Sequence, residues 1–123
     1  MKKFLKLTWM AVILFIAFNK AEGQINWLQS AGGNANDEAL GVDHDQYGNV
    51  YTCGYFSQAC RFDSIYLLSE GMGDIFISKQ DSLGFYLWVT RAGGANSDRA
   101  HSIATDIFGN IIITGVFRDT AIF

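Results

Sequence analysis

The feature that most constrains the fold is an internal repeat. The segment 45–56 reads DQYGNVYTCGYF, and it returns at 106–117 as DIFGNIIITGVF. The period of the repeat is therefore 61 residues, the offset between position 45 and position 106. Aligned without a gap, 27–62 and 88–123 share 12 identities over 36 positions. The shared residues are mainly turn formers and aromatics rather than a scatter of types. A repeat of this length predicts that one structural unit recurs along the chain.

The identities fall on positions that we predict to be structural. Within each turn, an aspartate accepts hydrogen bonds from backbone N–H groups, a glycine supplies a positive φ, and an asparagine tolerates one. We predict turn and packing roles for Asp45, Gly48, Asn49, Gly54, Phe56 and Trp27, and for their copies Asp106, Gly109, Asn110, Gly115, Phe117 and Trp88.

Alternating apolar residues bounded by turn signals predict short strands. A first strand is expected at 25–30, followed by a loop at 31–37. The less regular stretch 57–73 supplies a longer loop or an added hairpin. One period then holds four principal strands linked by tight turns or short loops, at 39–44, 49–56, 74–80 and 85–91.

A four-stranded antiparallel meander that repeats along the chain and is buried on both faces is typical of a β-propeller blade. The sequence therefore predicts an all-β fold in the region 24–123. Repeat 1 spans about 27–87 and a partial repeat 2 spans about 88–123. About one and a half repeats, each of roughly 61 residues, make an incomplete propeller.

Residues 1–23 are predicted to be a signal peptide. A basic start precedes an apolar stretch, and Ala21 and Gly23 are small residues at −3 and −1 of a cleavage site. A membrane anchor is the alternative, but only 13 residues separate Lys6 from Lys20, whereas a bilayer span needs about 20. We expect export to the cell surface or medium, with no membrane span after cleavage.

Charge excludes one class of partner. The part of the chain after residue 23 holds five cationic and eleven acidic residues, a net charge of about −6. Nucleic acids and anionic membrane surfaces reward clustered lysine and arginine. We therefore expect no nucleic-acid partner.

The two cysteines, Cys53 and Cys60, could be bridged in an exported protein. Their copies are Thr114 and Ala121, so the repeated fold does not need the pair. We favour two small buried thiols at strand positions. No further Cys or His stands at metal-ligand spacing, so we expect no metal.

Several residues of the repeat could suggest a catalytic or binding site, but turn formation and packing explain them better. Neither His44 nor His101 recurs in the other copy, which argues against a repeated acid–base site. The segment 43–49 has some features of a calcium loop, but Tyr47 occupies a ligand position. The AGG segments lack the lysine and helix of a phosphate loop. Stacking of the tryptophans on a sugar is the alternative to packing between blades. We expect no catalytic residues and no cofactor.

Taken in order, W-x-x-x-AGG, D-x-A, D-x-x-GN-x-[YI]-x-x-G-x-F and GDIFISK-x-D-x-x-G resemble the SBBP-type β-propeller repeat of secreted bacterial proteins, over residues 27–123. The resemblance implies a seven-bladed propeller within a large exported or surface protein, and it brings no catalytic residues. Cys53 departs from the pattern, because a small β-former such as Thr114 is more usual there. With so few repeats, we expect an N-terminal fragment of a longer protein or a truncated product.

The sequence thus predicts an exported, non-enzymatic propeller module that serves as a scaffold or recognises a protein or glycan at the cell surface. Ligand contacts are expected at 31–38, 57–73 and 92–99, and further blades of the same longer chain are the expected partners. Two alternatives stay open. One is the N-terminal part of a larger propeller enzyme whose active site lies in other blades. The other is a truncated product with no independent function.

Overall fold

The computed structural model describes residues 24–122, which form nine β-strands. The predicted signal peptide, 1–23, lies outside the described residues. Within the described range, no helix is both long enough and apolar enough to cross a bilayer.

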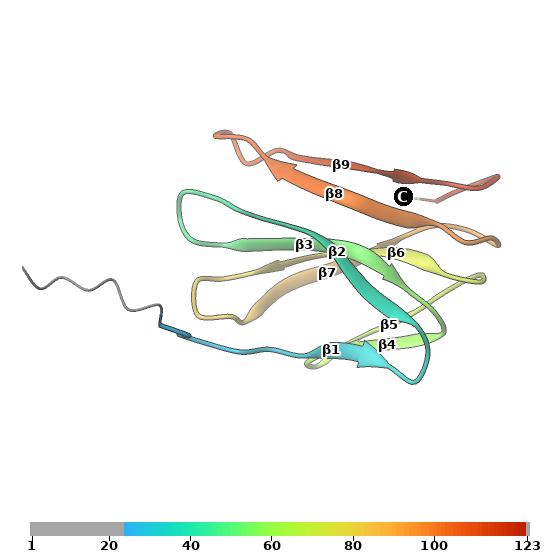
Figure 1. Ribbon diagram of the computed structural model, residues 1–123, viewed down its shortest axis with the longest axis horizontal. Coiled ribbons are helices and arrows are strands. Elements are labelled where there is room, and N and C mark those ends of the chain that lie inside the picture. Colours follow the sequence, from blue (N-terminus) through green and yellow to red (C-terminus); the bar gives the residue numbers. More distant parts are fainter. Residues whose placement is uncertain (1–23, 123) are drawn as a thin grey trace, which may run out of the picture.

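A four-stranded antiparallel sheet, here called the first blade, forms the middle layer of the molecule (Figure 1). Each strand pairs with the next of the four along the chain, so the sheet is a meander. The predicted blade is therefore confirmed. Its order is β2 (Asp37–His44), β3 (Val50–Phe56), β6 (Asp74–Gln80) and β7 (Tyr86–Ala92).

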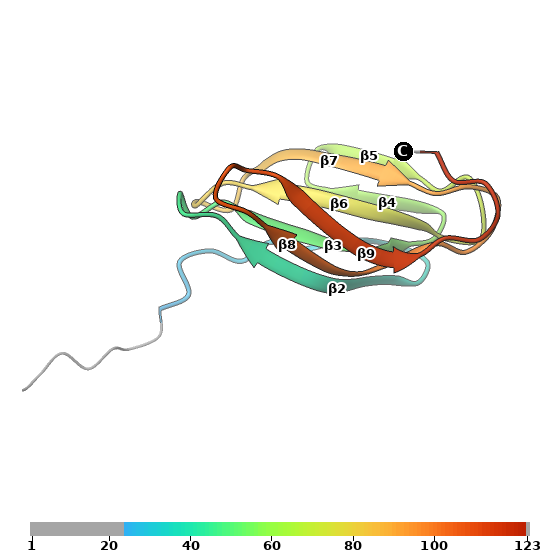
Figure 2. The same cartoon turned by 90° about the horizontal axis from the view of Figure 1, so that it is seen from above.

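A second hairpin, β8 (Arg99–Thr105) and β9 (Ile111–Val116), begins the next copy. It stacks on the face of the first blade, where β8 contacts β2 and β3 (Figure 2). The register between β2 and β3 shifts between Ala39 and Gly41, and the register between β8 and β9 shifts at the equivalent place, between Ala100 and Ser102. The two copies therefore share their local irregularities as well as their strands.

A three-stranded sheet of order β1-β4-β5 forms the remaining layer (Figure 1). It consists of β1 (Ala31–Gly33), β4 (Ala59–Phe62) and β5 (Ile65–Leu68). The stretch 57–73 thus contains the added hairpin that its length suggested. The pairing of Gly32 with Arg61 recurs one period later as a bridge between Gly93 and Ile122. In each copy, the glycine pair therefore pairs with the segment that follows the second strand of the blade, which contains Arg61 in the first copy and Ile122 in the second.

The predicted strand at 25–30 is not formed, and β1 lies instead in the stretch that the sequence predicts to be loop. The corresponding segment of the next copy forms β7, which pairs with β6. Within the described chain, 25–30 has no such neighbour beside it. An extended segment needs a paired ladder to satisfy its backbone groups, so the same pattern gives a strand only where a partner strand is present.

The two faces of the first blade are covered by separate hydrophobic clusters. One cluster lies between the blade and hairpin β8–β9, and its buried members are Tyr51, Cys53, Ile75, Ala92, Ala100 and Ile103. The other lies under the β4–β5 hairpin and contains Phe56, Cys60, Phe62 and Phe76. Full burial of each phenylalanine stabilises the fold by about 1.5–3 kcal/mol. A sheet buried on both faces is the arrangement that a propeller blade requires.

The connections separate into two ends of the molecule (Figure 1). The turns 45–49, 81–85 and 106–110 lie at one end, called the turn end below. The connections 57–73 and 93–98 lie at the other, called the loop end. This division follows from the meander, because every second connection returns to the same end.

We predict that Gly54→Ala destabilises the chain by about 1–3 kcal/mol, the usual penalty of overpacking. An added Cβ at Gly54 would lie 1.9 Å from the carbonyl oxygen of Glu38 on the paired strand, and the second copy shows the same at Gly115, 2.2 Å from the carbonyl oxygen of Arg99. Denaturant unfolding measures the effect. The matched control is Gly109→Ala, which meets nothing within 4 Å and bears only the strain of a φ of +84°. Equal losses for the two variants would contradict the packing argument.

Candidate functional site

The three Asp-x-x-Gly turns are closed by their own aspartates. Asp45 Oδ1 accepts hydrogen bonds from the backbone N–H groups of Tyr47 and Asn49, each at 2.9 Å, and Oδ2 accepts one from Asn49 Nδ2 at 2.7 Å. Asp106 repeats all three contacts with Phe108 and Asn110. The glycines have φ values of +79°, +88° and +84° at Gly48, Gly84 and Gly109 respectively. The aspartates, asparagines and glycines of these turns therefore stabilise the turns themselves.

The carboxylates of Asp45 and Asp106 are held by hydrogen-bond donors of their own turns. Hydrogen bonds from Asn110 are the main reason that the pKa of Asp106 is lowered. Desolvation is the largest effect on Asp45 and raises its pKa, but the bonds from Asn49, Tyr47 and Tyr51 together outweigh it and leave the pKa lowered. The calcium alternative would need these oxygens, which already accept N–H and O–H donors.

A second repeated carboxylate gives no sign of its role in the sequence. Asp98 is fully buried, and its two oxygens accept hydrogen bonds from the backbone N–H groups of Gly94 and Arg118, both at 2.8 Å. Asp37 makes the corresponding bonds to Gly33 and Ser57. Each aspartate thus ties the glycine pair to the end of the second strand of its copy. In the sequence, the repeated D-x-A motif marks this aspartate in both copies, but the motif does not indicate that the side chain is buried.

The aromatic positions behave differently in the two copies. Phe56 is fully buried, whereas Phe117 is 40% exposed. Trp88 packs against the cluster between the blades and makes an edge contact with Tyr51, with ring centroids 6.3 Å apart. Trp27 lies over the turn at Gly84, where an added Cβ would come within 2.6 Å of its indole. Trp88 thus belongs to β7 of the first blade, whereas Trp27 lies against that blade from the N-terminal segment.

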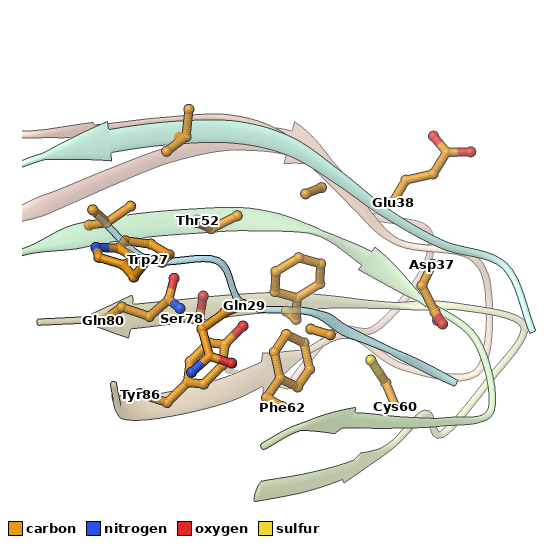
Figure 3. Close-up of a pocket in the computed structure, with 15 residues that line it drawn as sticks. Trp27, Gln29, Asp37, Glu38, Thr52, Cys60, Phe62, Ser78, Gln80 and Tyr86 are labelled. Atoms are coloured by element: carbon orange, nitrogen blue, oxygen red, sulfur yellow. The ribbon is translucent and has the colours of Figure 1, made fainter. Parts of the chain in front are cut away.

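A cleft of about 340 Å³ opens on the face of the first blade that does not contact β8–β9 (Figure 3). Trp27 and Gln29 of the N-terminal segment line it, together with Gln80 and Tyr86 of the sheet. Val42 is also part of the lining and is 69% exposed. An exposed valine in the middle of a strand shows that the β4–β5 hairpin covers only part of this face and leaves the part beside β2 open.

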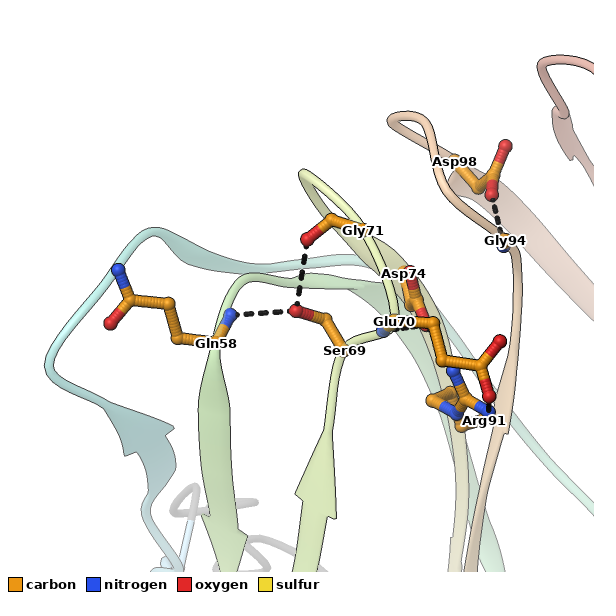
Figure 4. Close-up of polar contacts among 8 residues, drawn as sticks. All are labelled: Gln58, Ser69, Glu70, Gly71, Asp74, Arg91, Gly94 and Asp98. Atoms are coloured by element: carbon orange, nitrogen blue, oxygen red, sulfur yellow. Dashed lines mark hydrogen bonds and ion pairs between the residues drawn. The ribbon is translucent and has the colours of Figure 1, made fainter.

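The loop end holds an ordered polar network (Figure 4). The Arg91 guanidinium donates to Glu70 Oε1 and to Asp74 Oδ2, each at 2.6 Å. The hydrogen bonds that Arg91 donates to Glu70, and then to Asp74, raise the pKa of Arg91. Ser69 Oγ accepts from the backbone N–H of Gln58 at 2.9 Å. The network joins the stretch 57–73 to β6 and β7, so one of the segments predicted to contact a ligand has a defined shape.

Polar contacts also join the first blade to the second copy. Asp43 Oδ2 accepts from the backbone N–H of Thr105 at 2.6 Å and from its Oγ1 at 3.0 Å. The guanidinium of Arg99 lies 4.2 Å from the ring centroid of Tyr55, whose hydroxyl donates to Glu38. Both contacts link a first-blade strand to β8, so they fix the position of the second copy.

The structure does not join the sequence's reactive residues into one site. Cys53 and Cys60 are free thiols, each buried, and lie in different sheets. Burial is the main reason that the pKa of Cys60 is raised to about 11. His44 lies at the turn end, and its Nδ1 is 4.0 Å from Asp43 Oδ1. Among residues 24–122, no group of three or more His, Cys, Asp and Glu side chains is placed to hold a metal ion.

We predict that Asp98→Asn lowers the free energy of unfolding by about 1–3 kcal/mol, because one buried N–H loses its acceptor. Urea unfolding measures the loss. Asp63→Asn is the control, since Asp63 is exposed and asparagine tolerates its φ of 53°. That variant should change by less than about 0.5 kcal/mol. A neutral result at Asp98 would refute the structural role given to its carboxylate.

We also predict a pH signature at the contact between the copies. The backbone N–H of Thr105 is the main reason that the pKa of Asp43 is lowered. A lowered pKa stabilises the fold above the unfolded value of about 3.9, and this stabilisation is lost as pH falls through the folded pKa. Asp43→Ala, which installs the residue that the second copy carries at Ala104, should lower the urea midpoint at pH 7. The gap to the parent chain should close below about pH 4, and a gap independent of pH would contradict the ionic contact.

Comparison with known proteins agrees with this architecture. A relative among curated proteins is an uncharacterized WD repeat-containing protein of Acanthamoeba polyphaga mimivirus, 26% identical over 121 residues. The match covers 82% of this chain and 9% of that relative, so the chain spans about a tenth of its length. No solved structure matches. The family model described as "Beta-propeller repeat", SBBP, matches residues 87–116, from β7 to the end of β9. Residues 87–116 are therefore similar to the SBBP β-propeller repeat.

Proposed function

We propose that this chain is an exported, non-enzymatic β-propeller module whose blade faces accept further blades of the same longer chain. The assembled scaffold would present its ends to a protein or glycan at the cell surface. The observation that carries the proposal is a correspondence between the open cleft and the buried contact on the opposite face of the first blade.

The correspondence follows from the period of the repeat. In the second copy, Ala100 and Ile103 are buried against the first blade, and Ile111 and Ile113 pack on the same cluster. Subtracting one period gives the corresponding positions of the first copy, which all line the cleft: Ala39, Val42, Val50 and Thr52. The cleft is therefore lined by the positions that the second copy uses to bind a preceding blade.

The other side of such a contact is also present in the chain. The first blade offers Tyr51, Cys53 and Ile75 to the second copy, with Trp88 packed at the edge of that cluster. Trp27 is the copy of Trp88, and it already lies at the edge of the cleft. A blade that presents the counterparts of Tyr51 and Ile75 would complete the layer beside Trp27. This supports a repeated stack rather than an isolated unit.

Recognition is the second part of the proposal. Connections between strands lie at the surface and tolerate variation, so the ends of a rigid stack are where binding residues accumulate. At the loop end, the bonds among Arg91, Glu70 and Asp74 hold the stretch 57–73 in a fixed shape. A pre-ordered loop loses little entropy when it binds a partner.

We predict that a chain carrying residues 27–87 twice in tandem before 88–123 unfolds at a higher temperature than the parent. The added copy would cover the cleft of the copy that follows it. Each kcal/mol gained raises the midpoint by about 2–4 °C in a chain of about 150–250 residues, the size class of the tandem chain. Thermal unfolding followed by circular dichroism measures the shift.

The control places one substitution in two environments. Val42→Lys in the covered copy should abolish the gain, because a charge would be buried without a partner. The same change in the uncovered first copy, where Val42 is 69% exposed, should have little effect. An unchanged midpoint in the longer chain, or equal effects of the two substitutions, would refute stacking at the cleft.

A further inference from the structure

Large apolar side chains project from all three turns at the turn end. The third position of each Asp-x-x-Gly turn holds Tyr47, Leu83 or Phe108, with exposures of 76%, 69% and 83%. Each of the three offers its backbone N–H to the aspartate of its turn. The turn uses the main chain at this position and makes no demand on the side chain. Turn formation therefore does not explain why these residues are apolar.

Stacking of further blades does not explain their exposure either. Other exposed apolar residues, such as Val42 and Ile112, lie within strands, where a neighbouring blade or strand would cover them. The turns lie beyond the ends of the strands (Figure 1). Their side chains would stay exposed in a complete stack. Apolar groups that no layer of the fold can cover indicate an interaction surface.

A groove of about 340 Å³ lies between the turns of the two copies. Tyr47 lines it from the first copy and Phe108 from the second, and Gln46, His44 and Lys79 are among its polar residues. Lys79 Nζ lies 5.0 Å from the centroid of the Tyr51 ring. The volume is at the lower end of the range for small-ligand sites, about 300–1,000 Å³. The groove therefore suits one or two rings of a ligand.

We infer that this groove, called the turn groove, binds a neutral glycan chain. A pyranose ring has an apolar C–H face and a rim of hydroxyl groups. The rings of Tyr47 and Phe108 suit the apolar face, and the amide, imidazole and ammonium groups of Gln46, His44 and Lys79 suit the hydroxyls. The net charge of about −6 in 24–123 disfavours an anionic polymer.

Repetition of the turn favours a polymer over a single small ligand. Each copy contributes an Asp-x-Φ-Gly turn, where Φ is apolar, so successive pairs of blades would present successive grooves. A chain of identical sugar units can occupy several weak grooves at once, and linked sites bind far more tightly than one. The assignment rests on the proposed function, specifies its recognition part and moves the site from the loop end to the turn end.

The test is titration of the full chain with neutral hexasaccharides, namely cellohexaose, chitohexaose and maltohexaose, followed by NMR and calorimetry. We expect one of them to bind with a dissociation constant of about 1 mM or below, which is about −4 kcal/mol. Binding should be unchanged between 0.05 and 0.5 M salt, because no net charge is neutralised. Tyr47→Ala with Phe108→Ala should weaken it at least ~10-fold, a difference of about 1.4 kcal/mol.

Tyr66→Ala is the matched control, since Tyr66 is 67% exposed on β5, in a different sheet. It should leave saccharide binding unchanged, and thermal unfolding should confirm that all variants are folded. The inference is overturned if no hexasaccharide binds, or if binding survives loss of both rings. Capture of a protein through Tyr47 and Phe108 without saccharide binding would overturn it too. The tandem-copy experiment measures the effect of covering the cleft on thermal stability and does not involve the turn groove. The stacking proposal and the glycan proposal can therefore be refuted independently.

Discussion

The arrangement of the strands depends on a carboxylate that accepts backbone N–H groups at the start of each turn. Asp45, Asp81 and Asp106 each accept two such bonds through Oδ1. These bonds close the three hairpins at the same end of the molecule. Because the reversal is fixed locally, the strands on either side enter the sheet in a defined register. A slip of one residue would exchange the two faces of a strand, and both faces of this sheet are needed.

The need for two different faces explains how the copies fit together. One face of the first blade carries Tyr51, Cys53 and Ile75 toward the second copy, and the opposite face has the open cleft. Small residues allow the layers to approach closely: an added Cβ at Gly41 would lie 2.9 Å from Cys53 Sγ and 3.0 Å from the backbone nitrogen of Ile103. Hydrophobic stacking thus supplies the attraction, while glycine sets the distance.

What could be predicted from the sequence was local. The strands of the first blade and the hairpin within 57–73 could be predicted because alternation and turn residues act over a few positions. The strand at 25–30 is not formed, because pairing depends on a neighbour that no local pattern reveals. The burial of Asp98 could not be predicted either, since an aspartate in a polar loop gives no sign that both its oxygens are engaged. The exposure of Tyr47 and Phe108 could not be predicted either, because the Asp-x-x-Gly pattern that contains them was already explained by turn formation.

The register shifts in β2 and β8 have a consequence for the angle between the two copies. Leu40 in β2 and His101 in β8 are each the one extra residue that opposes no partner. Such a bulge bends its strand and increases the local twist. It recurs in both copies, in the two strands that contact each other between the copies, so β2 and β8 carry the same local irregularity. The angle at which the second copy meets the first blade therefore depends on these two positions. Deleting Leu40 would alter curvature without removing a single core side chain.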